Sequence, residues 1–359
     1  MPYPANYGGV IDVFYKLKAL HNAGVKITLH CFEYGREHAS ELEKYCEDIF
    51  YYKRQMSFLN LFKRNPFIIN TRCSDELISN LLQNDDPILF EGLHSCFYLK
   101  DERLKNRKKI VRTHNIEHDY YANLSKVEKG FFQKIYFAIE ARKLKRFESV
   151  LQYASCIAAI SKNDELHFKS RNKNTIIVSA FHQNETININ VEPSNFVLYH
   201  GNLGVSENYN AAIYLCEHIF ATTKIIFVIA GNNAPNVLKD VVNKYPNISL
   251  QENLSTESII TLINKAQINL LITQQATGIK LKLLAALYNG KHCVVNNEMI
   301  VNTGLEEFCI VGNTDEELKE QIAQYIKKPF STQDIEKRKR LENSMFSNLN
   351  NVKKLIDLL

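Results

Sequence analysis

The stretch Thr277-Gly278-Ile279-Lys280-Leu281-Lys282-Leu283-Leu284 decides the fold class, because it lies between two apolar runs typical of strands. Residues 268–273 form the run before it and residues 293–295 the run after it, and the helical pattern closes at Asn289-Gly290. This order predicts a strand, a short polar loop, a helix and a second strand, which is one βαβ unit. A small residue and a glycine leave the first N–H groups of the helix accessible to a phosphate or diphosphate. The alternative is an ordinary helix that happens to begin with threonine and glycine.

Length and composition indicate a globular protein with two domains. The chain has 359 residues, of which 45% are hydrophobic and 23% charged, and domains commonly hold about 100–200 residues. No run reaches the ~20 apolar residues that span a bilayer, and the start lacks a signal-peptide pattern. The eight cysteines occur singly, without a C-x-x-C pair. This pattern argues against structural zinc and indicates the reducing cytoplasm as the compartment.

The positive charge lies in the first half of the chain. Residues 1–180 hold 28 Lys+Arg against 21 Asp+Glu, a net +7, whereas residues 181–359 hold 16 against 18, a net −2. An anionic partner is therefore expected on the first half. Because no finger spacing or basic-aromatic RNA-binding pattern is present, we expect no nucleic-acid partner.

Strand-like and helix-like segments alternate in two successive series. The first opens with the glycine-bearing residues 7–9, a helix over 10–23 and a strand over 25–31. Such alternation predicts two doubly wound parallel sheets. We expect domains at residues 1–183 and 184–335, and a C-terminal helix, over residues 332–359, whose part after residue 335 packs back on the first domain. The expected strands are residues 25–31, 48–52, 87–90, 109–113, 156–160 and 175–178, then 196–200, 225–230, 248–250, 268–273, 292–295 and 309–311.

The pattern of the first domain is one strand short of a doubly wound sheet. A doubly wound domain normally opens with a strand that leads into the glycine loop, but only Met1-Pro2-Tyr3-Pro4 and two further residues precede Tyr7-Gly8-Gly9. We therefore expect the first strand to be missing from this sequence, and a start codon placed at an internal methionine is the favoured explanation, because loss of a central strand would expose backbone edges.

Five segments together span nearly the whole chain. They are Pro2-Tyr3-Pro4 with Tyr7-Gly8-Gly9, Arg112 to Glu117 with Tyr120-Tyr121, Ala159 to Asp164, His200 to Leu203 with Glu207-Asn208, and Thr277 to Lys291. By these segments, which stand in the expected order, the chain resembles the GT-B glycosyltransferases, in particular retaining family 4 (group 1) enzymes of bacterial polysaccharide synthesis. The resemblance implies two Rossmann-like domains facing a cleft, with a nucleotide-diphosphate sugar bound mostly against the second.

The resemblance also implies roles for individual residues. His114 is the catalytic candidate, and Glu91, His94 and Asn115 are the candidates for acceptor binding. For each of them the alternative is a structural role, such as a capping or buried histidine. The candidates for donor binding are Gly8, Gly9, Gly201, Asn202, Asn208, Gly231, Asn232, Thr277, Gly278, Ile279 and Lys280. For the glycines, the alternative is a turn that only glycine fits.

Two positions depart from the family pattern. Many members carry two glutamates separated by seven residues around the last motif, and these positions fall on Thr277 and Ala285. The resemblance assigns those glutamates to the donor sugar and ribose, so the donor cannot be inferred from them. Lys280 is the nearest cation that could offset diphosphate charge, or else a solvated helix residue. Because retaining members are thought to use the leaving phosphate as base, and no Asp-x-Asp motif follows a strand, we expect no metal and no cofactor.

Two stretches of the first domain mix basic and aromatic residues. Residues 50–67 are one, and residues 126–147 are the other. Apolar positions 132, 135, 136 and 139 fit one face of a helix. Such a surface could lie on the anionic inner leaflet of the cytoplasmic membrane. The alternative is a helix that packs this face on the sheet and leaves its Lys and Arg in water.

The sequence thus predicts a retaining, cytoplasmic glycosyltransferase that moves a sugar from a nucleotide diphosphate to a saccharide or lipid-linked acceptor in surface polysaccharide synthesis. Two alternatives stay open. One is a non-catalytic relative that binds saccharide or a partner enzyme, because Thr277 and Ala285 replace both glutamates. The other is a sugar-nucleotide epimerase on the same fold.

Overall fold

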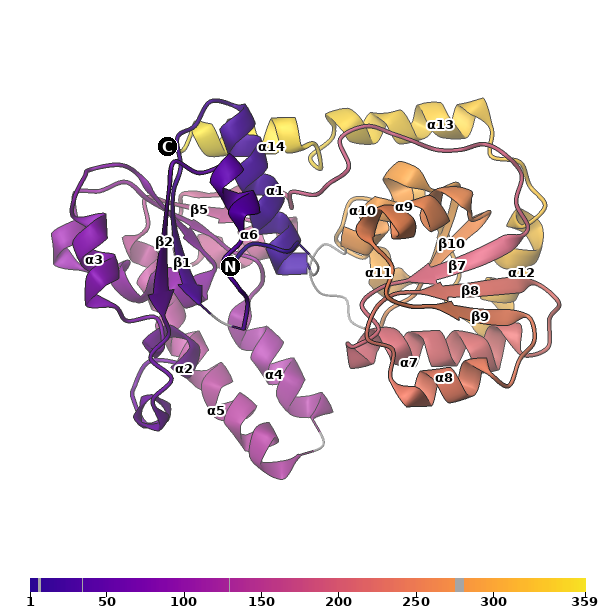
Figure 1. The fold of residues 1–359 in the computed structure, drawn as a ribbon, viewed down its shortest axis with the longest axis horizontal. Coiled ribbons are helices and arrows are strands. Elements are labelled where there is room, and N and C mark those ends of the chain that lie inside the picture. Colours follow the sequence, from indigo (N-terminus) through magenta and orange to yellow (C-terminus); the bar gives the residue numbers. More distant parts are fainter. Residues whose placement is uncertain (6–7, 34, 129, 275–280) are drawn as a thin grey trace. The chain divides into compact units, whose positions relative to one another are not determined.

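The structure, a computed structural model, describes residues 1–5, 8–33, 35–128, 130–274 and 281–359. It divides into two compact units (Figure 1). Met1–His182 and Asn348–Leu359 form the first, and Gln183–Ser347 form the second. The first unit therefore takes residues from both ends of the chain.

The second unit is built on one parallel sheet, with the strand order β12-β11-β10-β7-β8-β9 among the described residues. This is the order of the doubly wound dinucleotide-binding sheet, in which the fourth strand lies beside the first. The strands are β7 (Phe196–His200), β8 (Ile226–Ala230), β9 (Ile248–Gln251), β10 (Ile268–Leu271), β11 (His292–Val295) and β12 (Ile310–Val311). The prediction of a parallel α/β fold is confirmed, and β10 and β11 are the two strands of the predicted βαβ unit.

Helices cover both faces of this sheet, with α7 and α8 on one side and α9 and α10 on the other (Figure 1). The central strands β7, β8, β10 and β11 are buried on both faces, which explains their near-continuous apolar sequences. The helical segments are α7 (Ser206–Tyr214), the π-helical η6 (Leu215–Phe220), α8 (Asn236–Val242), α9 (Thr256–Lys265), α10 (Leu281–Asn289), α11 (Asn297–Ile300), η7 (Glu306–Phe308), α12 (Asp315–Tyr325), α13 (Thr332–Lys339) and η8 (Arg340–Asn343). In α10, good helix formers (Leu and Ala) fill the buried positions, and Gly290 follows directly after the last turn.

The described strands of the first unit form two parallel sheets. One has the order β1-β2 and the other β3-β4-β5-β6. Residues 1–5 form no strand, and the absence of a first strand from this sequence stays a prediction. The strands are β1 (Thr28–Glu33), β2 (Asp48–Lys53), β3 (Ile88–Glu91), β4 (Lys109–Arg112), β5 (Cys156–Ala159) and β6 (Thr175–Ile177).

The larger sheet of the first unit has a packed core on each face. On one face Ile110 and Ala158 meet Leu20 of α1 and Val352 of α14. On the other face the alternate strand residues meet α5 and α6. The helical segments are α1 (Gly8–Asn22), η1 (Ser40–Lys44), η2 (Phe58–Leu61), α2 (Phe67–Asn70), α3 (Asp75–Leu81), η3 (Leu93–Tyr98), η4 (Glu102–Leu104), α4 (Glu117–Val127), α5 (Phe131–Phe147), η5 (Glu148–Tyr153), α6 (Lys162–Lys169) and α14 (Asn348–Ile356).

The end of the chain differs from the single helix expected over residues 332–359. It forms α13, η8 and α14, with a break at residues 344–347. The reason is where its apolar residues are buried: Leu341 and Phe346 belong to the core of the second unit, whereas Val352 and Leu355 belong to the core of the first. Accordingly only residues 348–359, and not the whole of 336–359, are part of the first unit.

All eight cysteines are free, and most are buried. Among the helices that the structure describes, none combines the length and the apolar character needed to cross a bilayer.

Candidate functional site

In the first unit, predicted site residues gather where strands β3 and β4 end. These strands pair in parallel with Glu91 opposite Arg112, so their carboxyl ends lie at one edge of the sheet. His114 follows β4 by two residues, and Gly92 follows β3. Helix α1 begins at Gly8 and brings Gly9 beside His114, whose Nδ1 would be 4.0 Å from a Cβ at residue 9.

A buried carboxylate, Asp12, anchors this edge. Its Oδ1 lies 3.1 Å from Arg112 Nη2 and accepts the backbone N–H of Phe181 at 2.7 Å, and its Oδ2 lies 3.5 Å from Lys16 Nζ. Burial alone would raise the pKa of Asp12, but the charges of Arg112 and Lys16 outweigh it and hold the pKa far below its usual range. Asp12 is therefore ionised wherever the protein is folded at ordinary pH.

Glu91 links this anchor to His114. Its carboxylate lies 2.6 Å from Lys16 Nζ and 3.1 Å from His114 Nε2. Burial would raise the pKa of Glu91, yet Lys16 and His114 lower it. The His114 ring is thus held by a hydrogen bond at Nε2, which fixes its orientation and leaves Nδ1 toward Gly9.

The remaining acceptor candidates surround His114. The His94 ring is partly buried, and burial together with the positive charges of Arg72 and His114 lowers its pKa well below the usual value. Burial raises the pKa of Glu117, which lies at the start of α4. Asn115 is partly buried in the loop between His114 and α4. The structure therefore brings Glu91, His94 and His114 together at one strand edge.

Sequence reasoning missed Asp12 and Lys16. Both lie on α1, one turn apart, and are 2% and 1% exposed. The available signal was an acid and a lysine at i and i+4 in a helix that directly follows a glycine loop. That pair commonly lies on a solvated helix face, so only the tertiary partners Arg112 and Glu91 distinguish it.

In the second unit, the strand order places a switch point between β7 and β10, and ligands of doubly wound sheets bind outside the carboxyl ends of the strands at such a point. Gly201 and Asn202 follow β7 directly, and Gly231 and Asn232 follow β8. Beyond β10, the Thr273 hydroxyl donates a hydrogen bond to the Glu207 carboxylate at the start of α7.

Gly231 is required by a close backbone approach. A Cβ at this position would collide with the carbonyl oxygen of Gly201 and approach Leu203 Cγ to 2.9 Å. The two loops are joined further, because Leu203 N–H donates to Asn232 O at 3.0 Å. Asn232 Oδ1 in turn accepts the N–H of Leu254 at 3.1 Å. The glycines thus keep the loops after β7 and β8 in contact.

A cation missed by the sequence reasoning, Lys282, lies beside these loops. Its Nζ donates to Asn208 Oδ1 at 2.9 Å and stands 5.2 Å from the centre of the Tyr199 ring. Asn208 Nδ2 donates to Asn202 O at 2.9 Å. Two predicted donor residues, Asn202 and Asn208, are therefore grouped with a lysine. Thr277, Gly278, Ile279 and Lys280 lie outside the described residues, which resume at Leu281, and Ala285 lies within α10.

His200 closes β7 next to this group. It is 4% exposed, and its Nε2 has no hydrogen-bond partner within the part of the chain that the structure describes. Burial, with a contribution from Lys282, lowers the pKa of His200 to about 3. The imidazole is therefore neutral throughout the physiological range.

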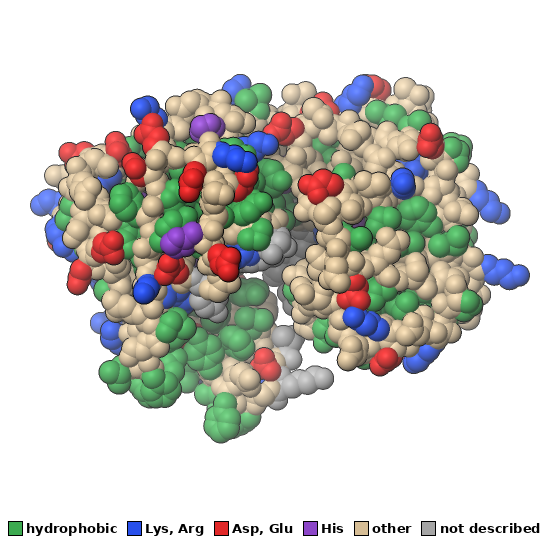
Figure 2. Space-filling view, in the orientation of Figure 1, with side chains coloured by type: hydrophobic (Ala, Val, Ile, Leu, Met, Phe, Trp, Pro, Cys, Tyr) green, Lys and Arg blue, Asp and Glu red, His purple; other side chains and the backbone are tan. Residues whose placement is uncertain are grey.

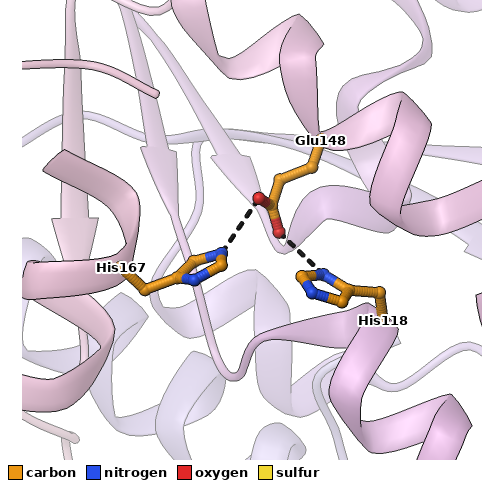
Figure 3. Close-up of side chains that lie close together, drawn as sticks. All are labelled: His118, Glu148 and His167. Carbon is orange, nitrogen blue, oxygen red and sulfur yellow. Dashed lines mark hydrogen bonds and ion pairs between the residues drawn. The ribbon is translucent and has the colours of Figure 1, made fainter. Parts of the chain in front are cut away.

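Among the described residues, two clusters in the first unit bring histidine and carboxylate groups close enough together to hold a metal ion. One is Asp12, Glu91 and His114, where Lys16 and Arg112 already neutralise the carboxylates. The other is shown in Figure 3.

In Figure 3 the rings of His118 and His167 point to the buried Glu148 carboxylate from two sides. His118 Nδ1 lies 3.0 Å from Oε2, and His167 Nε2 lies 2.9 Å from Oε1. Arg171 Nε adds a third donor at 2.8 Å. The guanidinium of Arg171 balances the buried charge of Glu148. This cluster can therefore fix α4 and α6 to η5 without a metal ion.

No protein-family model matches this chain. It is 25% identical over 346 residues to a Klebsiella pneumoniae protein described as an uncharacterized 44.6 kDa protein in the cps region, across 91% of this chain and 89% of that protein.

Solved structures show the fold more clearly. The sucrose-phosphate synthase of Thermosynechococcus elongatus superposes with a TM-score of 0.68 at 12% identity, over 98% of this chain and 92% of that one. HepE of Anabaena, solved with UDP and glucose, gives 0.63 at 12% identity over 96% and 95%. TarM of S. aureus, solved with UDP, gives 0.58 at 13% identity over 79% of this chain, which spans only 57% of TarM. The chain therefore has the GT-B fold of these proteins.

Proposed function

We propose that the protein is a cytoplasmic, retaining glycosyltransferase that moves a sugar from a nucleotide diphosphate to a saccharide or lipid-linked acceptor. The observation that carries this proposal is the loop group at the switch point of the second unit, where Gly201, Asn202, Asn208 and Lys282 lie together. Backbone N–H groups and one lysine at strand ends suit a diphosphate. The structures of HepE and TarM with UDP support a uridine nucleotide as donor.

In this proposal the donor diphosphate lies against the loops after β7 and β8, with Gly231 and Asn232 supporting them. Donor contacts by Gly8, Gly9 and residues 277–280 stay predictions of the sequence. Lys282 offsets phosphate charge as the bond from the sugar to the diphosphate breaks. With neither family glutamate at Thr277 and Ala285, donor recognition falls on backbone groups, amides and this lysine.

The strand-edge group of the first unit supplies the sugar and acceptor contacts. His114, held by Glu91 through Nε2, presents its ring to the transferred sugar. His94 and Asn115 contact the acceptor. Because the charges of Asp12 and Glu91 are already matched by Lys16 and Arg112, we propose that transfer needs no metal ion and that the leaving phosphate takes the acceptor proton.

A surface polysaccharide is the proposed acceptor class. The support is the Klebsiella pneumoniae relative, whose description places it in a cps region. The acceptor is a growing saccharide, free or attached to a lipid.

Titration calorimetry with UDP, GDP and their sugars tests the donor assignment. Binding of one nucleotide class is expected, and absence of binding to every one of them would overturn the proposal. A turnover assay that detects free nucleotide and product, with and without EDTA, then tests transfer. The retaining outcome is read from the anomeric configuration of the product by NMR.

The same assays separate two other activities. A non-catalytic relative would bind nucleotide or saccharide and release no product. An epimerase would interconvert donors in the absence of acceptor, whereas the transferase requires one.

A further inference from the structure

The first unit exposes large apolar side chains in two segments. Phe58, Leu59 and Phe62 of the η2 region are 69%, 70% and 76% exposed, and Phe131 and Phe132 at the start of α5 are 70% and 84% exposed. Figure 2 shows hydrophobic side chains gathered at the end of this unit where Figure 1 places α5 and the chain around α2. Grouped exposed aromatic residues mark an interaction surface.

Helix α5 turns an amphipathic stripe toward solvent. Its buried side consists of Glu140, Ala141, Leu144 and Phe147. The alternative in which the face formed by residues 132, 135, 136 and 139 packs on the sheet is therefore excluded for residues 132, 135 and 139, whose side chains are 84%, 42% and 44% exposed. Spacings of three and four residues place the following on one helix face: Phe132, Ile135, Ile139, Lys143 and Arg146. The stripe is apolar in its first half and basic in its second.

The η2 region is fixed against the basic half of the stripe. Lys143 Nζ donates to Leu61 O at 2.6 Å and lies 3.0 Å from Glu140 Oε1. Glu140 Oε2 also accepts the N–H of Phe67 at 2.6 Å. These partly buried bonds join the η2 region to α5, so Phe58 and Phe62 belong to the same surface as the α5 stripe.

A basic pocket lies where these segments meet η5. It has a volume of about 240 Å³, and its cations are Arg64, Lys100, Lys143 and Arg146. Ser149, Gln152 and Tyr153 add hydroxyl and amide groups, and the described lining contains no carboxylate. The side chains of Arg64, Lys100 and Arg146 make no hydrogen bond or ion pair with other described residues. Unmatched guanidinium and ammonium groups around a small pocket suit a phosphate group.

We propose that the first unit docks on an anionic lipid bilayer through this surface, with the phosphate of a lipid headgroup in the basic pocket. The exposed aromatic side chains of η2 and α5 enter the boundary between headgroups and acyl chains. A lipid is favoured over a free phosphate because the cations are continuous with exposed apolar side chains, which a free ion would not contact. The inference does not rest on the proposed sugar transfer.

Co-sedimentation of the full chain with vesicles, without any sugar nucleotide, tests the inference. Vesicles of phosphatidylcholine with roughly 30% phosphatidylglycerol should bind the protein, and pure phosphatidylcholine vesicles should bind it much more weakly. Raising the salt from about 0.1 M to about 1 M should weaken the binding, since the contribution of the surface charges is screened.

Two variants separate the charged and apolar contributions. Arg64→Glu with Arg146→Glu should lower the vesicle partition coefficient by at least about tenfold, since each basic residue near such a surface contributes about fivefold. Phe58→Ser with Phe62→Ser should also lower it, and to a similar extent at high salt as at low salt. The matched control is Lys224→Glu with Lys244→Glu, which makes the same charge change on exposed residues of the second unit and should bind as the wild type does.

Other results would overturn the inference. They are equal binding to neutral and anionic vesicles, or wild-type binding by both test variants. A free-phosphate site would instead show calorimetric binding of inorganic phosphate that Arg64→Glu abolishes, without vesicle binding. Failure of sugar transfer, by contrast, leaves the vesicle result standing.

Discussion

Lys16 Nζ lies 2.6 Å from Glu91 Oε1, and the lysine is 1% exposed. This pair joins helix α1 to the end of strand β3. Since Glu91 also holds His114 through Nε2, the position of the histidine depends on α1, which begins at Gly8. A displacement of α1 would therefore also move the ring of His114, the candidate catalytic residue.

Removing the charge of Asp12 should destabilise the first unit. In Asp12→Asn, Arg112 keeps its buried guanidinium without a full counter-charge, which costs about 3–5 kcal/mol. Because the pKa of Asp12 is lowered in the folded state, its stabilisation is present above the unfolded pKa and is lost as the pH falls below about 4. Urea unfolding at neutral and acidic pH measures both effects.

The control for this prediction is Asp101→Asn. Asp101 also pairs with an arginine, Arg103, but that pair lies at the surface with the arginine 54% exposed. Its loss should cost no more than about 1 kcal/mol. Equal costs for the two substitutions would contradict the anchoring role of Asp12.

His114→Asn should lower kcat by about 100-fold while leaving the free energy of unfolding nearly unchanged. The reason is that the ring contacts reacting groups in the proposed mechanism and is only partly buried in the fold. Steady-state kinetics with the donor identified by calorimetry gives kcat and KM separately. His21→Asn, on an exposed position of α1, is the matched control, and wild-type turnover in His114→Asn would remove this residue from the mechanism.

Gly231→Ala should destabilise the second unit by about 3 kcal/mol or more, since a Cβ would collide with the backbone at Gly201. Thermal and urea unfolding report the loss. Gly8→Ala is the comparison, because a Cβ there meets open space and alanine favours the helix. It should fold as stably as the wild type, and a lower donor affinity in this variant would place the donor beside the start of α1.

Lys282→Met should weaken UDP binding by about 10- to 100-fold, which corresponds to loss of one charge-assisted hydrogen bond of about 1.5–3 kcal/mol. Titration calorimetry measures it. Lys265→Met removes an exposed lysine of the neighbouring helix α9 and should bind as the wild type does. If Lys282→Met also binds UDP as tightly as the wild type does, the diphosphate does not lie beside Lys282.

His200→Gln should flatten the dependence of stability on pH. The pKa of His200 is lowered to about 3 by burial, so its neutral ring stabilises the fold above the unfolded pKa of about 6.5, and this stability is lost as the pH falls toward 3. Between pH 8 and pH 5 the wild type should lose about 2 kcal/mol more than the variant. Urea unfolding at several pH values tests this, with the exposed His38→Gln as control; parallel curves for His200→Gln and wild type would contradict it.

Local patterns in the sequence were sufficient for the sheet of the second unit, but not for the division of the described strands of the first unit into two sheets. The apolar runs that became β7, β8, β10 and β11 are near-continuous, as buried parallel strands require, and glycines 201 and 231 follow two of them. The Asp12–Arg112 pair was not predictable in this way, since its members lie 100 residues apart. Lys282 resembles any helix lysine until Asn208 and Tyr199 are placed beside it.

The apolar stripe of α5 shows another limit of periodicity. A spacing of three and four residues identifies which side chains share a face, but does not say whether that face meets the sheet or the solvent. In this helix the polar Glu140 is buried, because it binds Lys143 and the backbone of Phe67. The tertiary partners of one carboxylate thus decide which face of the helix is buried.

The membership of α14 in the first unit bears on the order in which the protein folds during synthesis. Val352 and Leu355 fill the core beneath α1, and Asn348 is bound to the backbone of His182. Domains generally fold as units while the chain emerges, yet the ribosome delivers the whole second unit before these residues. The first unit is therefore synthesised first but can be completed only when α14 has left the ribosome. Until then the apolar face that Val352 and Leu355 cover is exposed on the nascent chain, where chaperones could bind it.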